Sequence, residues 1–235
     1  MLNRSKILEG VDCEREFKLV TSRGNFEAFL LKKPGENLSA EVKTKIFNEF
    51  YLVALSAFGK KKSPQFNLDV SNHLFNVGFL VLVFDFENGG KGVAFRTFTF
   101  LDHKQSKILY IEGTAIKAEY QGSGIYQSLT KELAVGMDFV VSRTQNPVVI
   151  TALSKLHKEV YPVTAEPDET IKNIGFCVAE YLKMSEYERD LMIGRKTYGG
   201  ILNGTLPDTG NGMRKAVTNL IDPYNGDCLI AVCPV

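Results

Sequence analysis

A short glycine-containing segment has the residue types that bind phosphate. It reads Gln121-Gly122-Ser123-Gly124-Ile125-Tyr126. Glycine adopts backbone conformations that other residues resist, and it lets a ligand approach the main chain closely. A helix that begins beside it presents N–H groups without partners and the positive end of its dipole, which together can bind an anion. Taken alone, Gly-x-Gly more often marks only a tight turn, so the neighbouring residues must decide between these interpretations.

The residues on both sides of the segment predict a strand, a turn and a helix. Ile108–Ile111 and Thr114–Ile116 supply the β-branched and aromatic residues of a buried strand. After the turn, apolar residues recur at helical spacing, at Ile125, Leu129, Leu133 and Val135. Met137–Val141 then begins a second apolar strand. Two strands separated by one helix indicate a parallel, right-handed crossover, and phosphate-binding turns lie at the carboxyl end of such strands.

Two common nucleotide-binding motifs are excluded by individual residues. A dinucleotide fingerprint needs a third glycine where Gln127 stands, and an acidic residue after the next strand, where Ser142-Arg143-Thr144 follows instead. A P-loop needs Gly-Lys-Ser or Gly-Lys-Thr at the start of the helix, and Gly124-Ile125-Tyr126 is different. Neither of these nucleotide-binding motifs therefore accounts for the turn.

The pattern Gln121-x-x-Gly124-x-Tyr126 resembles the acyl-CoA signature of the GCN5-related N-acetyltransferase (GNAT) superfamily, which is Arg or Gln, two residues, Gly, one residue, and Gly or Ala. The resemblance extends from Gly78 to Val160. In that family an Asn opens the helix after the next strand, and Asn146-Pro147 stands at that place. Asn is a strong N-cap and Pro suits the first helical position, so these residues predict a helix start on physical grounds as well.

The resemblance implies an α/β (α+β) fold with a mixed, mostly antiparallel central sheet, flanked by helices, and with the parallel crossover at the cofactor site. It implies a divergent family member that transfers an acetyl group from acetyl-CoA (coenzyme A) directly to an amine in a ternary complex. We expect a single domain over residues 1–235, with a core at about 17–160 and a C-terminal extension, 161–235, that completes the sheet. The residues that the resemblance places at the cofactor are Ala115, Ile116, Lys117, Gln121, Gly122, Ser123, Gly124, Ile125, Tyr126 and Asn146.

Two positions depart from the family pattern. Tyr126 stands where Gly or Ala is usual, so either the helix approaches the pyrophosphate differently or the ring covers the cofactor. Leu153 stands where many members have a Tyr that protonates the departing thiolate. Cofactor binding is therefore better supported by the residues than the usual proton transfer. A non-catalytic acyl-CoA-binding sensor or scaffold is the alternative that Leu153 favours, and a longer-chain acyltransferase is a third.

Acyl transfer to an amine needs a neutral amine, donors for the oxyanion and a proton for the leaving thiolate. Glu112 is the only charged residue between Ile108 and Ile116, and its carboxylate would relay a proton beside the acceptor; the alternative is a surface carboxylate. The resemblance implies that the oxyanion donors are backbone N–H groups around Ile116. Tyr126 and Tyr161 are the nearest phenols in sequence for the acid, although such rings more often serve packing. Glu112 and Tyr161 are thus the candidate catalytic residues.

Other reactive side chains carry weaker signals. Ser123 lies inside the turn without the Gly-x-Ser-x-Gly pattern of a nucleophile elbow. His73 and His103 have no second ligand at nearby spacing, so no metal site is expected. His157 is expected on a solvated helix face. Arg143, at a strand end, either meets a phosphate or a carboxylate or is a surface residue.

The remaining elements follow the order that the resemblance implies. Short polar connections between extended segments predict antiparallel neighbours. Strands are expected at 17–20, 26–31, 78–86, 92–101, 107–117 and 227–235. Helices are expected at 39–57, where Ser39 is the cap, from 147 onwards and at 171–184. A long loop is expected at 194–212.

Composition excludes several classes of protein. With 235 residues, a net charge of +1 and 44% apolar residues, the chain can bury a full core and has neither a nucleic-acid footprint nor a disordered composition. Four scattered cysteines, and the lack of a secretory signal, predict a reduced, cytoplasmic setting. The longest apolar run, Val77–Phe86, is too short to span a membrane.

We expect a small-molecule amine or a peptide as acceptor, and either a monomer or a homodimer that pairs through the final strand.

Overall fold

The computed structural model describes residues 6–202, 205–210 and 212–235 of the chain. These residues form two compact units. The first unit runs to Thr99 and includes Glu112–Thr130, and the second contains Phe100–Ile111 and Lys131–Val235. Each unit is therefore built from two separate stretches of chain, and each is described by itself below. The expected single domain over the whole chain stays a prediction.

The sheet of the first unit is antiparallel. Its strands are adjacent in chain order: β1 (Arg15–Thr21), β2 (Gly24–Lys32), β3 (Phe79–Asp85) and β4 (Lys91–His103) up to Thr99. The β1–β2 hairpin closes with Thr21 opposite Gly24. The short polar connections thus give antiparallel neighbours, as the sequence predicts.

Three α-helices separate β2 from β3, namely α1 (Pro34–Asn37), α2 (Ala40–Phe58) and α3 (Pro64–Phe75). This unit also contains two short 3₁₀ turns, η1 (Lys6–Leu8) and η2 (Ala118–Tyr120). The Ser39 hydroxyl caps α2 by accepting from the N–H of Val42 at 3.3 Å, and Gly59 ends the helix with a φ of 58°. Both ends of α2 are therefore those that the sequence predicts. α3 is not among the expected helices, although Ser63 caps it and Pro64 occupies its first position.

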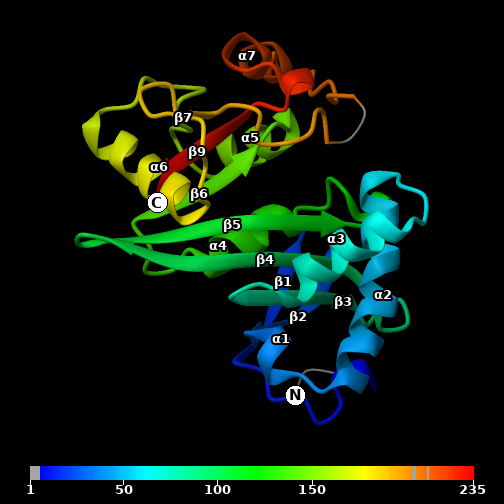
Figure 1. The fold of residues 1–235 in the computed structure, drawn as a ribbon. Coiled ribbons are helices and arrows are strands. Elements are labelled where there is room, and N and C mark those ends of the chain that lie inside the picture. The colour runs from blue at the N-terminus through cyan, green and yellow to red at the C-terminus, as the bar shows by residue number, and fades with distance from the viewer. Residues whose placement is uncertain (1–5, 203–204, 211) are drawn as a thin grey trace. The chain divides into compact units, whose positions relative to one another are not determined.

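The two faces of this sheet are occupied by different residues. On one face, apolar residues of α2 and α3 pack on the strands in a single cluster that includes Phe50, Leu74, Phe84, Phe95 and Ala115. Figure 1 shows α2 and α3 beside the strands of this unit. Side chains alternate along a strand, so the neighbours of Phe95 and Ala115 point to the opposite face.

The second unit contains the one parallel pair among the described strands. Its strand order is β5 (Ser106–Ile116) up to Ile111, β6 (Phe139–Thr144), β9 (Cys228–Pro234), β8 (Ile193–Gly194) and β7 (Tyr187–Glu188). β5 and β6 are parallel from the pair Ile108–Phe139 to the pair Ile111–Ser142, and the other pairs are antiparallel. The chain between them contains α4 (Ile125–Leu133), as expected for a parallel crossover. The fold is thus a mixed, mostly antiparallel sheet flanked by helices, as predicted.

The helices of the second unit are α5 (Pro147–Ser154), α6 (Glu169–Tyr181) and α7 (Met213–Leu220), with a 3₁₀ turn at η3 (Pro223–Asn225). The apolar face of α6 packs on the sheet, where Ile174 and Val178 join Tyr110, Val141 and Ile230 in one cluster. Among the helices of the described residues, none is both long and apolar enough to cross a lipid bilayer.

One expectation about α4 is wrong. Val135 was expected on the apolar stripe of this helix, but the helix ends at Leu133 and Val135 is 75% exposed. The chain turns there because Gly136 has a φ of 77° and Met137 N–H donates to the Ala134 oxygen at 3.0 Å. The apolar spacing in the sequence therefore continues to Val135, whereas the left-handed Gly136 marks the turn that follows the end of the helix.

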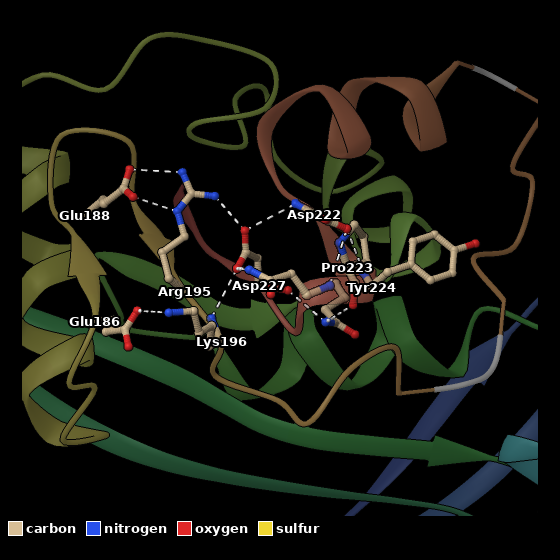
Figure 2. A network of polar contacts seen from close by, with 10 residues as sticks. Glu186, Glu188, Arg195, Lys196, Asp222, Pro223, Tyr224 and Asp227 are labelled. Atoms are coloured by element: carbon tan, nitrogen blue, oxygen red, sulfur yellow. Dashed lines mark hydrogen bonds and ion pairs between the residues drawn. The ribbon is translucent and has the colours of Figure 1, made fainter.

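Ion pairs and hydrogen bonds order the C-terminal part of the second unit (Figure 2). Asp227 is 1% exposed, and its carboxylate accepts from Arg195 Nη1 at 2.6 Å and from the Lys196 N–H at 3.1 Å. Arg195 also makes a bidentate pair with Glu188, at 2.6 and 3.0 Å. The Asp222 N–H donates to the same Asp227 carboxylate at 3.3 Å. This network connects β7, β8 and the start of β9.

Candidate functional site

The glycine-containing turn connects the end of β5 to the first residue of α4. Gly122 has a φ of 73° and Gly124 a φ of 94°, which is the left-handed region that favours glycine. Gly124 directly precedes Ile125, where α4 begins, and its oxygen accepts the first helical hydrogen bond from the Ser128 N–H at 2.9 Å. The local sequence therefore produces the strand, glycine turn and helix that it predicts.

The turn presents several hydrogen-bond donors at the helix start. Within the part of the chain that the structure describes, the N–H groups of Gly122, Gly124 and Ile125 make no hydrogen bond. The Ser123 N–H is different, because it donates to the Tyr120 oxygen at 3.3 Å. Unpaired N–H groups at the positive end of a helix are suited to an anion.

A buried hydroxyl provides a second, independent observation at this turn. Ser123 is 1% exposed, and its Oγ has no hydrogen-bond partner among the described residues. Buried polar side chains are nearly always paired, so an unpaired hydroxyl inside a turn of N–H donors fits a polar ligand. Together with the glycines, which add no side-chain bulk, these groups leave several unpaired polar atoms at the start of α4.

The β1–β2 hairpin lies against the turn, a contact that the sequence does not predict. Ser22 Oγ donates to the Ser123 oxygen at 3.4 Å, and Ser128 Oγ donates to the Val20 oxygen at 3.1 Å. A methyl group placed on Gly124 would lie 3.7 Å from Thr21 Cβ. The exposed Arg23 follows Ser22 at the tip of this hairpin. No local pattern signals the contact, because it joins residues from distant parts of the chain.

Side chains of the first unit hold the turn in place. Gln121 Nε2 donates to the oxygens of Ala57 and Ile116, at 3.2 and 3.1 Å. The Ala118 N–H donates to Ser56 Oγ at 3.0 Å. The amide of Gln121 thus ties the turn to the end of β5 and to α2, so this side chain positions the main chain of the turn.

Tyr120 is held close to the same turn. Its hydroxyl donates to Asp85 Oδ2 at 2.9 Å. Burial and this hydrogen bond raise the pKa of Tyr120 to about 12. The phenol therefore stays protonated and serves as a fixed donor to Asp85.

The ring of Tyr126 packs on a buried arginine of β4. The Arg96 guanidinium lies 4.3 Å from the centre of the Tyr126 ring, and Arg96 Nη2 donates to the Tyr126 oxygen at 3.3 Å. Arg96 also donates to Thr130 Oγ1 at 2.7 Å and to Thr114 Oγ1 at 2.9 Å. Burial lowers the pKa of Arg96 to about 10, so the side chain is still a cation at neutral pH. Arg96 is not among the expected site residues, and its signal in the sequence is a charge inside an otherwise apolar strand.

The end of β5 carries the other predicted residues of the first unit. The ladder with β6 stops at Ile111, and β5 continues to Ile116. Ala115 is buried in the α2 and α3 core, and the Lys117 N–H donates to the Val93 oxygen at 2.9 Å. Glu112 is half-buried, and its carboxylate accepts a hydrogen bond from Thr99 Oγ1.

The remaining predicted residues belong to the second unit. Asn146 Oδ1 accepts from the Val148 N–H at 2.9 Å and so caps α5, as predicted on physical grounds. Tyr161 donates its hydroxyl proton to Glu159 at 2.5 Å, and this hydrogen bond is the main reason that the pKa of Tyr161 is raised. Leu153 is fully buried in α5, so this position provides no proton donor.

Two further side chains of the second unit differ from expectation. His157 is not on a solvated helix face, because α5 ends at Ser154 and His157 Nδ1 lies 3.0 Å from the Pro234 oxygen. Its partial burial lowers the pKa of His157. Arg143 lies over the ring of Tyr198, 5.0 Å from the ring centre, so it packs within the unit.

Across the residues that the structure describes, no group of three or more His, Cys, Asp or Glu side chains could hold a metal ion.

Comparisons with known proteins give matches at the level of structure alone. No family profile and no curated protein sequence matches the chain. The ribosomal-protein-S18-alanine N-acetyltransferase of Escherichia coli is similar, with a TM-score of 0.45 and 13% identity, over 88% of this chain and 94% of that one. Naa50 of Arabidopsis thaliana, in complex with a bisubstrate analogue, has a TM-score of 0.42 and 11% identity, over 88% and 99%. The ribosomal-protein-S5-alanine acetyltransferase of Vibrio fischeri has a TM-score of 0.40 and 16% identity, over 65% and 89%. The Escherichia coli and Vibrio fischeri proteins are acetyltransferases by name.

Proposed function

We propose that this protein is an acetyl-CoA-dependent N-acetyltransferase. The observation that carries the proposal is the turn from Gln121 to Tyr126. It joins the β5 strand of a parallel crossover to α4, contains two left-handed glycines, and presents unpaired N–H groups beside the unpaired hydroxyl of Ser123. In this proposal, the turn holds the pyrophosphate of the cofactor through its main chain.

The proposal assigns roles to the other predicted residues. When bound, acetyl-CoA supplies an activated acyl carbon, and its acyl arm follows β5 over Glu112–Ile116, beyond the ladder with β6. The Glu112 carboxylate, held by Thr99, attracts a cationic amine and helps to relay its proton. Asn146 and Tyr161 are proposed as contacts to the pantetheine arm and as the acid, respectively. The acceptor is a small amine or a peptide amine, and transfer is direct.

Calorimetric titration with acetyl-CoA tests the proposal. Wild-type protein should bind acetyl-CoA, and Gly124→Trp should abolish binding because the side chain fills the space at the turn. Gly124→Ala is a milder variant: a non-glycine residue in a left-handed conformation costs about 1–2 kcal/mol of strain. Gly136→Ala is the matched control, because Gly136 has a φ of 77° and open space around it, but lies after α4. If the wild-type protein is folded but does not bind acetyl-CoA, the turn has only a structural role and the proposal is wrong.

Turnover separates the enzyme from a binding module. Release of the free thiol of coenzyme A should accelerate when a panel of amines, amino acids and peptides is added with acetyl-CoA. Binding without turnover across the whole panel would favour the sensor or scaffold that the buried Leu153 suggests. Replacing acetyl-CoA with fatty acyl-CoA in the same assay tests the longer-chain alternative.

A further inference from the structure

One histidine of the first unit lies against the strand that carries Glu112. His73 is in α3, and its ring contacts β5 at Gly113. A methyl group placed on Gly113 would lie 3.2 Å from His73 Cδ2 and 3.8 Å from His73 Nε2. The shorter distance is tighter than ordinary contact, so a side chain at position 113 would displace the ring. Gly113 therefore lets an imidazole lie directly against β5, at the residue that follows Glu112 in sequence and on the face of the sheet that α2 and α3 cover.

A hydrogen bond at the other side of the ring fixes the position of its proton. His73 Nδ1 lies 3.0 Å from the backbone oxygen of Asp69. A carbonyl oxygen only accepts hydrogen bonds, so Nδ1 carries the proton and Nε2 of the neutral ring keeps a lone pair. His73 is exposed to solvent, and Nε2 is a ring atom that faces Gly113. The imidazole is thus held as a proton acceptor, with its accepting nitrogen toward β5.

A buried hydroxyl of β4 lies at the same place. Thr97 is fully buried, and its Oγ1 makes no hydrogen bond within the described part of the chain. The methyl group placed on Gly113 would lie 3.3 Å from this oxygen. Buried polar groups are nearly always paired, so an unpaired hydroxyl beside an accessible imidazole indicates a place where a polar ligand atom binds.

We propose that His73 is the general base of the acyl transfer and that its Nε2 takes a proton from the acceptor amine. This inference rests on the proposed function, because it needs the acyl arm to lie along Glu112–Ile116. The amine nitrogen forms a C–N bond with the acyl carbon, the C–S bond breaks, and the thiolate leaves with the electron pair of that bond. The proton released by the nitrogen passes to Nε2, and the exposed ring returns it to solvent.

The protonation state of the ring can be measured without any assay of activity. The chain has three histidines, so the ring nitrogens of ¹⁵N-histidine-labelled protein can be assigned with single substitutions. We expect neutral His73 to be the Nδ1–H tautomer, whereas free histidine prefers Nε2–H. Gly113→Ala should shift the His73 ring signals, and the control Gly136→Ala should leave them unchanged. A neutral Nε2–H tautomer at His73 would overturn the assignment.

Kinetics provides the second test. His73→Ala suits an exposed helical position, so it should fold and bind acetyl-CoA like the wild type. Its kcat should fall by about 10²–10³-fold, and imidazole added to the buffer should restore part of the rate. His103→Ala is the control and should show neither effect.

Full activity of His73→Ala, or a lost rate that imidazole leaves unchanged, would overturn the assignment and leave the proposed function intact. Wild-type protein that does not bind acetyl-CoA would overturn the proposed function, and the assignment of His73 with it.

Discussion

The guanidinium of Arg96 lies 4.3 Å from the centre of the Tyr126 ring, and it also donates to the main-chain oxygen of Tyr126. One buried cation of β4 thus holds both the side chain and the backbone of a residue in the first turn of α4. Among the described residues, Arg96 bonds to hydroxyls and a carbonyl rather than to a carboxylate. Its uncompensated charge therefore adds to the positive end of the α4 dipole.

Loss of the Tyr126 ring should destabilise the first unit. We expect Tyr126→Leu to lower the free energy of unfolding by about 2 kcal/mol, because a desolvated cation–π contact is lost while Arg96 stays buried. Tyr126→Phe keeps the aromatic face and should retain most of this stability. Urea denaturation of the two variants measures the difference. Equal stability of the Leu and Phe variants would show that the ring face contributes nothing.

A charge reversal at the hairpin tip should weaken cofactor binding. The β1–β2 hairpin contacts the turn through Ser22 and Ser123, so Arg23 brings a positive charge to its neighbourhood. Arg23→Glu should weaken acetyl-CoA binding several-fold at low salt, and the difference should shrink near 1 M salt, where the Debye length is about 3 Å. Lys18→Glu, an exposed change earlier in β1, is the control. Equal losses in both variants would indicate a general effect of net charge.

Glu112 should affect the acceptor more than the cofactor. Glu112→Gln removes the charge that attracts a cationic amine, so we expect KM for the acceptor to rise by roughly 5–10-fold, equivalent to about 1 kcal/mol. The affinity for acetyl-CoA should stay unchanged in calorimetry. Glu119→Gln, an exposed acidic residue of η2, serves as control. If acetyl-CoA binding falls instead, Glu112 supports the strand rather than the acceptor.

Asp227 should contribute to acid unfolding of the second unit. Burial would raise the pKa of this carboxyl, but hydrogen bonds from Arg195 and from the N–H groups of Lys196 and Asp222 hold its pKa below the usual value. Its stabilising contribution is therefore complete above about pH 4, the value for a free Asp, and is lost as the pH falls through the lower folded value. Asp227→Asn should flatten the dependence of Tm on pH in this acid range, and the exposed Asp12→Asn should leave it unchanged.

Removing the cationic partner of Asp227 tests the same network at neutral pH. Arg195→Met should lower the free energy of unfolding by about 2 kcal/mol, because a hydrogen bond to a buried charged group is lost. Lys196→Met removes only the exposed pair with Glu186, and its expected effect is within about 0.5 kcal/mol. Urea unfolding of the two variants provides the comparison. A similar small loss in both would mean that Asp227 finds other partners.

Local sequence signals were sufficient for the elements that form the candidate site. Ser39 and Gly59 mark the two ends of α2, Asn146 caps α5, and the residues around Gly124 predict the strand, turn and helix. Signals of this kind depend on a few neighbouring residues, so they can be recognised without the fold. Val135 shows their limit, because apolar spacing continues beyond the glycine that ends the helix.

Contacts between distant residues were not predictable from these signals. Arg96 is separated in sequence from Tyr126, and Ser22 from Ser123, so only the folded sheet and helix bring each pair together. His73 appeared isolated in the sequence because its neighbours, Thr97 and Gly113, come from two other strands. The residues that hold or complete the proposed site are therefore those for which the sequence has no local pattern.

The interleaving of the two units restricts how the gene can be dissected. The first unit takes Glu112–Thr130 from the middle of the chain, and the second takes Phe100–Ile111 from before it. A truncation placed between Phe100 and Thr130, from either end of the chain, thus removes part of both units. Separate expression would need a rejoined or circularly permuted gene for each unit. Truncated chains that aggregate would accordingly say little about either unit's own capacity to fold.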